Sequence, residues 1–245
     1  MKVYIQSYKN DVPRNYNFMN AFQGFREMGF EIVPFHDNEK LCESCKEDIV
    51  VGFVETVRDR LNDFRIITPE MDYPEELQKY LGRKIWQTKM SEVSNIPEHW
   101  PVFVKPLEDK QFTGVVVRST KELIGCGIPG SDQDVYCSEI VEFEAEWRCF
   151  VRYGHILDVR PYKGDWRKHY DYKVIENSVN DFSSAPAGYA ADFGLTSDGR
   201  TLLIEVNDGY ALGCYGLFYI DYAKLLSARW AELTGTEDEC AFDVL

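Results

Sequence analysis

Hydrophobic and polar residues alternate with two different periods along the first seventy positions. A period of two marks short strands, and a period between three and four marks helices. An apolar stripe that runs from Phe18 to Met28 predicts a helix, which Gly29 closes. Short apolar runs predict strands over residues 2–6, 31–35 and 49–53, with a second helix over 54–61. The order of these elements predicts a small βαβ-like unit.

A connector with two prolines, residues 68–74, marks the best candidate for a domain boundary. We expect a small α/β domain over residues 1–75 and a larger domain over residues 76–245. The larger domain should begin with a helix over residues 76–93 and end with an amphipathic helix over residues 219–233. Between them the pattern predicts strands at 102–105, 115–117, 135–151, 156–162, 189–196 and 201–207.

The last two predicted strands form a hairpin around Asp198-Gly199, a strong two-residue turn. Counting back from that turn pairs Thr196 with Thr201, Phe193 with Ile204, and Asp192 with Glu205. Asn207 then lies on the face shared by Asp192 and Glu205. Two opposed carboxylates repel unless a cation lies between them. Oxygen ligands from Asp192, Glu205 and Asn207 suit magnesium. The alternative is an exposed hairpin whose acids are solvated.

A second hairpin carries arginines. With residues 153–155 as a three-residue loop, Val151 pairs with Leu157 and Arg148 with Arg160, and Lys163 lies just beyond. Opposed like charges are unfavourable, and a bound polyanion or carboxylate would relieve them. The alternative is that the acids on the same segment, Glu142, Glu144 and Glu146, neutralise the arginines.

A third signal is the lysine at the end of the strand over residues 102–105. Lys105 precedes a polar loop, and a lysine on a rigid strand beside such a loop gives a positioned charge for a phosphate. The loop supplies Lys110, Thr113 and Gly114. Lysines at strand ends are also common as solvated residues, so this signal alone is weak.

Composition and charge narrow the class of partner. The 245 residues carry a net charge of −14, which disfavours nucleic acid as a partner. No apolar run approaches membrane-spanning length, and no secretory signal opens the sequence. Seven scattered cysteines indicate a reducing cytoplasm. Cys42 and Cys45 with His36 could supply half a zinc site, but no second pair with ligand spacing follows.

Taken in order, the strand lysine with its loop, the Glu139…Glu146 strand and the hairpin ending in Glu-x-Asn resemble the ATP-grasp superfamily. The two arginines followed by a lysine resemble its clade named for two arginines and one lysine. The resemblance covers about residues 83–245. It implies an ATP-grasp fold of α/β (α+β) class with antiparallel sheets, preceded by a small α/β N-terminal domain.

The resemblance also implies roles for particular residues. Lys105 would contact the α- or β-phosphate, and Lys110, Thr113 and Gly114 would belong to a lid over the triphosphate. Adenine would lie against Glu139, Ile140 and Val141, and the ribose against Glu146. Asp192, Glu205 and Asn207 match magnesium ligands, and Arg148, Arg160 and Lys163 would hold the γ-phosphate and a carboxylate. One further phosphate lysine would be Lys84 or Lys89.

The function implied is that of an ATP- and Mg²⁺-dependent carboxylate–amine ligase acting through an acyl phosphate. Its partners would be a small-molecule or peptide carboxylate and an amine acceptor. Two alternatives stay open from the sequence. A small-molecule kinase on the same fold would stop after phosphoryl transfer, and a regulatory module would bind nucleotide without turnover.

Overall fold

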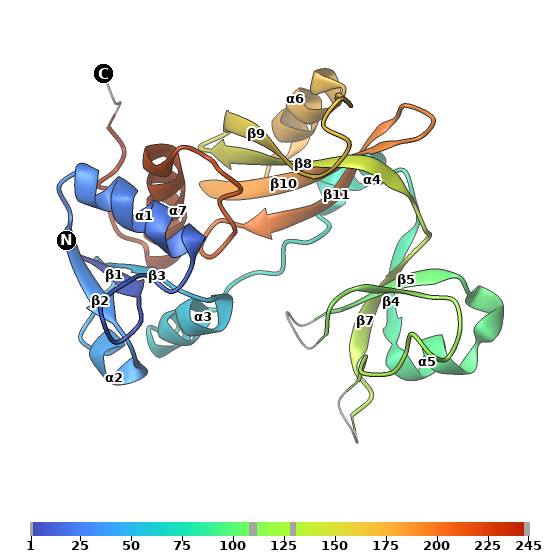
Figure 1. Cartoon of the computed structure of the whole chain (residues 1–245), viewed down its shortest axis with the longest axis horizontal. Coiled ribbons are helices and arrows are strands. Elements are labelled where there is room, and N and C mark those ends of the chain that lie inside the picture. The colour runs from blue at the N-terminus through green and yellow to red at the C-terminus, as the bar shows by residue number, and fades with distance from the viewer. Residues whose placement is uncertain (1, 108–111, 128–130, 243–245) are drawn as a thin grey trace. The chain divides into compact units, whose positions relative to one another are not determined.

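The computed structural model describes residues 2–107, 112–127 and 131–242 (Figure 1). Contacts group the chain into two compact units. Unit 1 comprises Met1–Tyr80 and Phe143–Leu245, and unit 2 comprises Leu81–Glu142. These units are defined by contacts between residues and do not test the predicted domains, residues 1–75 and 76–245, which stay a prediction.

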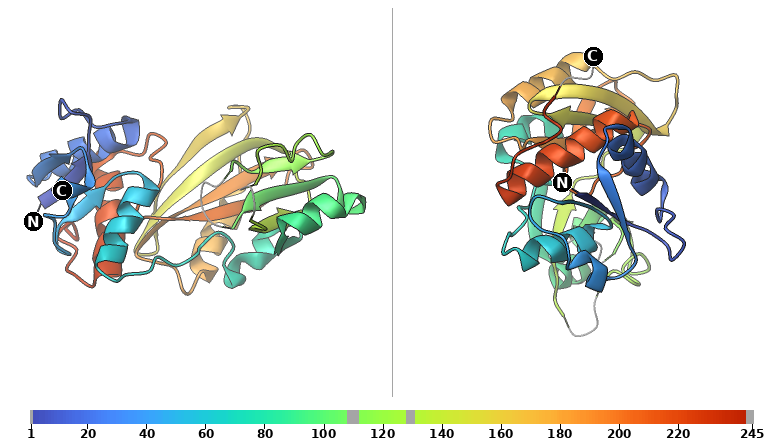
Figure 2. Two further views of the ribbon diagram at one scale, coloured as in Figure 1. Left: turned by 90° about the horizontal axis from the view of Figure 1, so that it is seen from below. Right: turned by 90° about the vertical axis from the view of Figure 1, so that its left-hand side faces the viewer.

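The N-terminal part of unit 1 is the βαβ-like unit that the sequence predicts. Its three strands are parallel in the order β2-β1-β3, because each connection between them is long enough for a crossover. Figures 1 and 2 show α1 on one face of this sheet and α2 and α3 on the other. The elements are β1 (Lys2–Gln6), α1 (Tyr16–Glu27), β2 (Glu31–Phe35), α2 (Asn38–Leu41), β3 (Ile49–Val51) and α3 (Val54–Asp63).

The C-terminal helix α7 (Tyr219–Thr234) is buried on nearly all sides rather than amphipathic. It packs on α1, β3, β8 and β10, so it joins the N-terminal sheet to the sheet that follows. The side chains of Lys224 and Arg229 are therefore buried within it. The helix ends at Gly235, whose φ of 68° suits glycine, as the sequence predicts.

The second sheet of unit 1 has four antiparallel strands in the order β11-β10-β8-β9, and Figure 2 shows them side by side. One face packs on α6 (Tyr172–Asp181), a helix that the sequence analysis did not predict. Asp171 caps this helix by accepting a hydrogen bond from the Lys173 N–H. The strands are β8 (Phe143–Arg152), β9 (His155–Gly164), β10 (Gly188–Thr196) and β11 (Thr201–Asp208).

A β-bulge corrects the predicted register between β10 and β11. Near the turn, Leu195 pairs with Thr201 and Phe193 with Leu203, one residue away from the predicted pairs. The register then shifts between Asp192 and Phe193, so Asp192 pairs with Glu205 as predicted. The register predicted from the turn was wrong by one residue on the turn side of the bulge. The bulge shifts the register by one residue and so restores the predicted pair of Asp192 and Glu205.

The β8–β9 hairpin contains the same kind of correction. Its turn is the two residues Tyr153 and Gly154, both with positive φ (48° and 74°), so the predicted three-residue loop is wrong. Val151 pairs with Ile156 rather than Leu157, and a register shift follows between Phe150 and Val151. Beyond it, Arg148 pairs with Arg160 as predicted.

Unit 2 is built on a four-stranded antiparallel sheet in the order β4-β7-β5-β6. The predicted helix over residues 76–93 is wrong, because Gly82 takes a φ of 59° and the chain then pairs as β4 with β7. The short helices η1 (Glu75–Leu77) and α4 (Gln78–Leu81) precede unit 2, which begins at Leu81. The elements of unit 2 are β4 (Ile85–Lys89), α5 (Met90–Asn95), η2 (Pro97–His99), β5 (Val102–Pro106), β6 (Val115–Val117) and β7 (Asp134–Ser138). Among the described residues, no helix is long and apolar enough to cross a membrane.

Candidate active site

Four charged side chains form one row across the whole sheet of β8 to β11. Glu205 on β11 is the partner of Asp192 on β10, which is the partner of Arg148 on β8, and Arg148 is the partner of Arg160 on β9. Directly paired residues lie on the same face of a sheet. The two hairpins of the sequence analysis therefore place their charges in one continuous row of two acids and two arginines.

Arg148 and Asp192 are the centre of this row. The guanidinium donates from Nε to Oδ1 and from Nη2 to Oδ2 of Asp192, both at 2.7 Å. The two side chains are only 7% and 4% exposed. Burial and the nearby Glu205 raise the pKa of Asp192, and Arg148 opposes that shift. In return, the charge of Asp192 raises the pKa of Arg148 against the effect of burial. We regard the pair as ionised, because the bidentate geometry fits two charges.

The repulsions predicted between Asp192 and Glu205 and between Arg148 and Arg160 are both reduced by the ion pair of Arg148 and Asp192. The cation beside Asp192 and Glu205 is Arg148, and the anion beside the two arginines is Asp192. Arg160 lies 3.2 Å from Asp158. The alternative was that Glu142, Glu144 and Glu146 neutralise the arginines. Glu144 and Glu146 instead pair with the lysines Lys168 and Lys163, at 2.7 Å and 2.5 Å.

Three further predicted residues share the face of the charged row. Glu146 and Lys163 are paired across β8 and β9, two residues from Arg148 along β8. Asn207 lies two residues from Glu205 on β11, and its Nδ2 donates to Asp192 Oδ2 at 3.3 Å. Unit 1 therefore gathers Arg148, Arg160, Lys163, Glu146, Asp192, Glu205 and Asn207 on one face of one sheet.

The acid end of the row has donors that suit a divalent cation. The hydrogen bond from Asn207 Nδ2 to Asp192 leaves the amide oxygen of Asn207 as the acceptor of that side chain. Asp192 is more constrained, since Oδ2 accepts from two donors and Oδ1 from one. The set of oxygen donors fits Mg²⁺, with Glu205 and Asn207 as the more accessible ligands and Asp192 limited by Arg148.

Two tyrosines that the sequence analysis missed line the arginine end of the row. Tyr215 lies on the loop after β11 with a φ of 41°, and the Arg148 guanidinium lies 4.7 Å from the centroid of its ring. Tyr162 on β9 stacks against Tyr215 with ring centroids 5.0 Å apart. Burial, then the charges of Asp192 and Glu146, raise the pKa of Tyr162. In the sequence, the only indication of this loop was the pair Gly213 and Gly216 on either side of Tyr215.

Unit 2 carries the remaining predicted nucleotide residues. Lys105 lies on β5, and its Nζ is 5.7 Å from the ring centroid of Tyr136 on the neighbouring β7. Thr113 and Gly114 are exposed just before β6. A Cβ on Gly114 would lie 2.6 Å from the Phe103 ring, so this loop packs closely on β5. Lys110 lies outside the described residues.

The predicted adenine residues follow β7. Glu139 accepts from the Lys84 backbone N–H at 2.9 Å, and its own N–H donates to Lys84 O at 3.1 Å. Ile140 and Val141 are half-buried in the segment that leaves the unit. Lys89 is engaged with Asp134 at 2.8 Å, whereas Lys84 lies just before β4 with its Nζ 5.5 Å from the Trp86 ring centroid. Lys84 is therefore the better candidate for the additional phosphate lysine.

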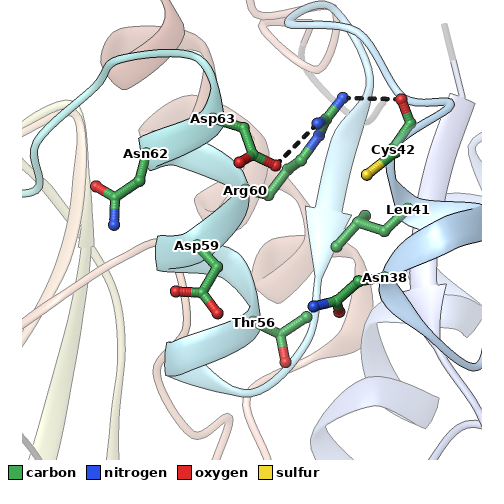
Figure 3. A pocket seen from close by; sticks show the side chains of 8 residues that line it. All are labelled: Asn38, Leu41, Cys42, Thr56, Asp59, Arg60, Asn62 and Asp63. Atoms are coloured by element: carbon green, nitrogen blue, oxygen red, sulfur yellow. Dashed lines mark hydrogen bonds and ion pairs between the residues drawn. The ribbon is translucent and has the colours of Figure 1, made fainter.

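The cysteine pair shows no sign of a metal site. Cys45 donates to Asp48 at 3.2 Å, and burial followed by that bond raises the pKa of its thiol. His36 instead lies 3.1 Å from Asp11. Within the part of the chain that the structure describes, no three His, Cys, Asp or Glu side chains converge to hold a metal ion. Cys42 lines a pocket of about 410 Å³ between α2 and α3, where Arg60 is bound to Asp63 and to the Cys42 carbonyl (Figure 3).

Comparison with solved structures shows the fold. A D-alanine–D-alanine ligase from Bacillus anthracis matches with a TM-score of 0.57 and 15% identity, over 95% of this chain and 96% of that one. An N5-carboxyaminoimidazole ribonucleotide synthetase from Thermotoga maritima matches with a TM-score of 0.56 and 17% identity, over 95% and 76%. A D-cycloserine synthetase matches with a TM-score of 0.60 and 12% identity, over 94% and 100%.

Comparison of sequences shows the family. No curated protein matches the chain. The family model described as "ATP-grasp domain, R2K clade family 2" matches residues 80–225, which is more than half of the chain. The resemblance carried by the strand lysine, the arginine hairpin and the acidic hairpin is confirmed, and the chain belongs to the ATP-grasp superfamily, in family 2 of its R2K clade.

Proposed function

We propose that the protein is a carboxylate–amine ligase that uses ATP and Mg²⁺ and acts through an acyl phosphate. The observation that carries this proposal is the row Glu205–Asp192–Arg148–Arg160 in a chain of the ATP-grasp superfamily. The proposal is supported by the nature of these side chains, since carboxylate oxygens suit a cation and guanidinium groups suit anions, and both lie on one face of the sheet. Charge that develops during phosphoryl transfer is stabilised by groups held in place beforehand.

In the proposed reaction, a carboxylate oxygen of the substrate attacks the γ-phosphorus of ATP, and the bond to the β-phosphate oxygen breaks. ADP leaves and an acyl phosphate forms. An amine then attacks the acyl carbon, phosphate leaves, and the amine loses a proton, which gives an amide. Bound Mg²⁺ would neutralise charge on the phosphate oxygens.

The chain's own residues bind and orient the reactants. We assign the γ-phosphate and the reacting carboxylate to Arg148, Arg160 and Lys163, and the cation to Glu205, Asn207 and Asp192. The α- or β-phosphate is assigned to Lys105, with Thr113, Gly114 and Lys110 in the loop over the triphosphate. Glu139, Ile140 and Val141 are assigned to adenine, and Glu146 to the ribose. The pairing of Glu146 with Lys163 supports a connection between the ribose and phosphate ends of the site.

The decisive experiment measures release of ADP and phosphate across pools of amino acids and small carboxylates, with mass spectrometry of the products. A ligase releases ADP and phosphate in equal amounts only when both a carboxylate and an amine are present, and the product mass is that of an amide. A stable phosphorylated product would identify a kinase instead. Nucleotide binding without any ADP release would identify a regulatory module.

The seven cysteines are all free thiols, and five of them are buried. We propose that the protein works in the reducing cytoplasm. The substrates we propose are a small-molecule or peptide carboxylate and an amine.

A further inference from the structure

Two neighbouring cavities of unit 1 lie at the C-terminal end of α7, and we call them together the α7 groove. The larger has a volume of about 540 Å³ and the smaller of about 280 Å³, and both are lined by Phe182, Pro186 and Glu232. Tyr153, directly after β8, also lines the larger cavity and follows Arg148 by five residues. At about 3.3 Å per residue of strand, that separation is about 16 Å. The α7 groove is therefore distinct from the charged row of the candidate active site.

Much of the lining of the α7 groove is apolar. Phe182 and Pro186, which both cavities share, are buried, and the ring of Phe182 is held edge-to-face against the buried Tyr189 with centroids 5.3 Å apart. Small or flexible apolar side chains supply most of the rest, namely Ala185, Ala187, Ala228 and Ala231 in the larger cavity and Met71 in the smaller. Apolar side chains of a ligand are stabilised on such a surface because they leave water.

The one cationic side chain that lines the groove is already neutralised. Arg229 is 5% exposed, and its three guanidinium nitrogens donate to carboxylates, two of them to Asp208 and one to Glu232. Glu232 accepts this bond and one from the Ala187 N–H with the same oxygen, Oε2. No described residue donates to its Oε1, and the side chain is 41% exposed. Glu232 thus keeps one carboxylate oxygen for a ligand.

The segment of residues 183–187, which runs past both cavities, offers few donors to a ligand. Its backbone N–H groups all donate within the protein, at Ser183, Ser184, Ala185 and Ala187, and Pro186 has none. The hydroxyls of Ser183 and Ser184 both donate to Glu76 and lower its pKa, so this acid stays charged. A ligand bound here must therefore supply the hydrogen-bond donors itself.

The electrostatics of the groove favour a cation as that donor. Its charged lining consists of Arg229 and four acids, Glu70, Glu76, Glu232 and Asp238. The helix α7 ends at Thr234, and its last turn carries no basic residue. The partial negative charge at the C-terminus of a helix is then not compensated from within the helix. Acids and helix terminus together attract ammonium or guanidinium groups.

We propose that the α7 groove binds a basic peptide segment that carries both cationic and apolar side chains. Lysine or arginine side chains of the peptide donate to Glu232 and Glu70, and its apolar side chains lie on Phe182 and Pro186. In an extended peptide, side chains on one side are about 6–7 Å apart, so one peptide fills two neighbouring cavities. A free polyamine has no apolar side chains to cover the apolar lining. The proposal concerns a partner site and does not depend on the ligase function.

The test measures binding of a short labelled peptide of alternating lysine and leucine to the full-length protein, by fluorescence anisotropy at about 0.15 M salt and without nucleotide. Two comparison peptides alternate lysine with serine and glutamate with leucine. The lysine–leucine peptide should bind, the lysine–serine peptide should bind at least tenfold more weakly, and the glutamate–leucine peptide should not bind. Equal affinity of the two lysine peptides, or no binding of the lysine–leucine peptide at millimolar concentration, overturns the proposal.

Variants of the groove test where the peptide binds. Ala185→Trp fills the larger cavity without a change in charge. The double variant Glu70→Gln with Glu232→Gln removes two charges, while the amides keep an acceptor oxygen. Each should weaken binding of the lysine–leucine peptide at least tenfold. The matched control is Glu39→Gln with Glu98→Gln, which removes two exposed acids elsewhere and should bind as wild type.

Equal weakening in the control and in the groove double variant would show general attraction to an acidic protein and overturns the proposal, as does unchanged affinity in Ala185→Trp. If the double variant has lost its cooperative melting transition, Ala185→Trp alone decides. Two other occupants give outcomes of their own. Spermine that displaces the peptide at an equal or lower concentration identifies a polyamine site, and self-association of the wild type that Ala185→Trp abolishes identifies a second copy of the chain. Either result overturns the peptide as occupant.

Discussion

At the scale of single residues, the pair Arg148–Asp192 connects stability to chemistry. Asp192 fixes the guanidinium through two bonds of 2.7 Å, and Arg148 in turn compensates a carboxylate that is buried beside Glu205. Neither side chain would be tolerated alone at this depth, because an unpaired buried charge is costly. The arrangement gives the sheet an arginine whose orientation is fixed by its partner.

We predict that Arg148→Met destabilises the protein by about 3–5 kcal/mol, because it leaves Asp192 buried without its partner. The double variant Arg148→Met with Asp192→Asn should recover most of that loss, since no charge then remains unpaired. Urea unfolding of the wild type, both single variants and the double variant measures the coupling. Equal stability of Arg148→Met and the wild type would show that the pair does not contribute to folding, contrary to its geometry.

The stability of Arg148→Met should also depend on pH in a definite direction. Burial and Glu205 raise the pKa of Asp192, and the variant lacks the guanidinium that opposes this shift. A carboxyl whose pKa is higher in the folded than in the unfolded state stabilises the fold below its unfolded pKa, and that contribution is lost as pH rises through the folded pKa. The stability difference from wild type should therefore be smaller at pH 5 than at pH 8. In the double variant with Asp192→Asn, the difference should not change with pH.

At the scale of elements, two β-bulges explain why part of the site could be predicted from the sequence. Both hairpins were predicted, yet the pairs next to each turn were wrong by one position, and the β8–β9 turn is one residue shorter than predicted. A bulge in each hairpin adds one residue to a strand and returns Asp192 to Glu205 and Arg148 to Arg160. A bulge has no clear sequence signal. The pairs Asp192–Glu205 and Arg148–Arg160 were predicted correctly only because the error in each turn and the bulge in each hairpin cancel.

The pairing between the hairpins was beyond the sequence analysis for a different reason. β10 lies beside β8, so Asp192 meets Arg148 across a contact between segments 44 residues apart. Within one hairpin, cross-strand neighbours can be counted from the turn, whereas the register between two hairpins depends on how the whole sheet assembles. The internal ion pair was missed for that reason, and an external cation and anion were expected in its place.

Close packing of α1 against α7 carries the next prediction. A Cβ on Gly24 would lie 2.2 Å from the Tyr219 carbonyl oxygen and 2.8 Å from Ala223 Cβ. Gly24→Ala should therefore destabilise the protein by about 1–3 kcal/mol through overpacking. In an exposed helix the same change would stabilise by about 0.5–1 kcal/mol, so the sign of the effect is diagnostic.

The control for this helix is Gln23→Ala, on a neighbouring and less buried position of α1. It should change stability by no more than about 0.5 kcal/mol. Because Asn17 and Asn20 hold the loop after β11 to the same helix, displacement of α1 by Gly24→Ala should also displace this loop. Stabilisation by Gly24→Ala in urea unfolding would show that the two helices are not in contact at this point.

At the scale of the whole molecule, the proposed nucleotide residues are divided between the two compact units. Lys105, Thr113, Gly114, Glu139, Ile140 and Val141 belong to unit 2, and the charged row with Glu146, Lys163 and Asn207 belongs to unit 1. The order of the ATP-grasp motifs could be predicted from the sequence because each motif is a short continuous segment. The insertion of unit 2 between the two parts of unit 1 could not be predicted, because it depends on the packing of α7 on the N-terminal sheet and on β8 and β10.

This division leads to a prediction about stability in the presence of nucleotide. ATP with Mg²⁺ at a hundredfold excess over the dissociation constant should stabilise the protein by about 2.7 kcal/mol through mass action. Lys105→Ala in unit 2 and Glu205→Gln in unit 1 should each reduce that stabilisation at a fixed nucleotide concentration, because each removes a group assigned to the phosphates or to their cation. Thermal unfolding of the three proteins with and without nucleotide measures the effect.

The role of the cation is tested in the same measurements by replacing Mg²⁺ with EDTA. Chelation should reduce the stabilisation of wild type and of Lys105→Ala, but should have little further effect on Glu205→Gln, whose cation ligand is already removed. Lys121→Ala, an exposed lysine of unit 2, controls for a general loss of positive charge. If Lys105→Ala and Glu205→Gln both keep the full wild-type stabilisation while the wild type responds to ATP, nucleotide binds elsewhere and the assignment of both residues is wrong. If only one of them loses it, only the unit that carries that residue takes part in binding, and the motif in the other unit has a different role.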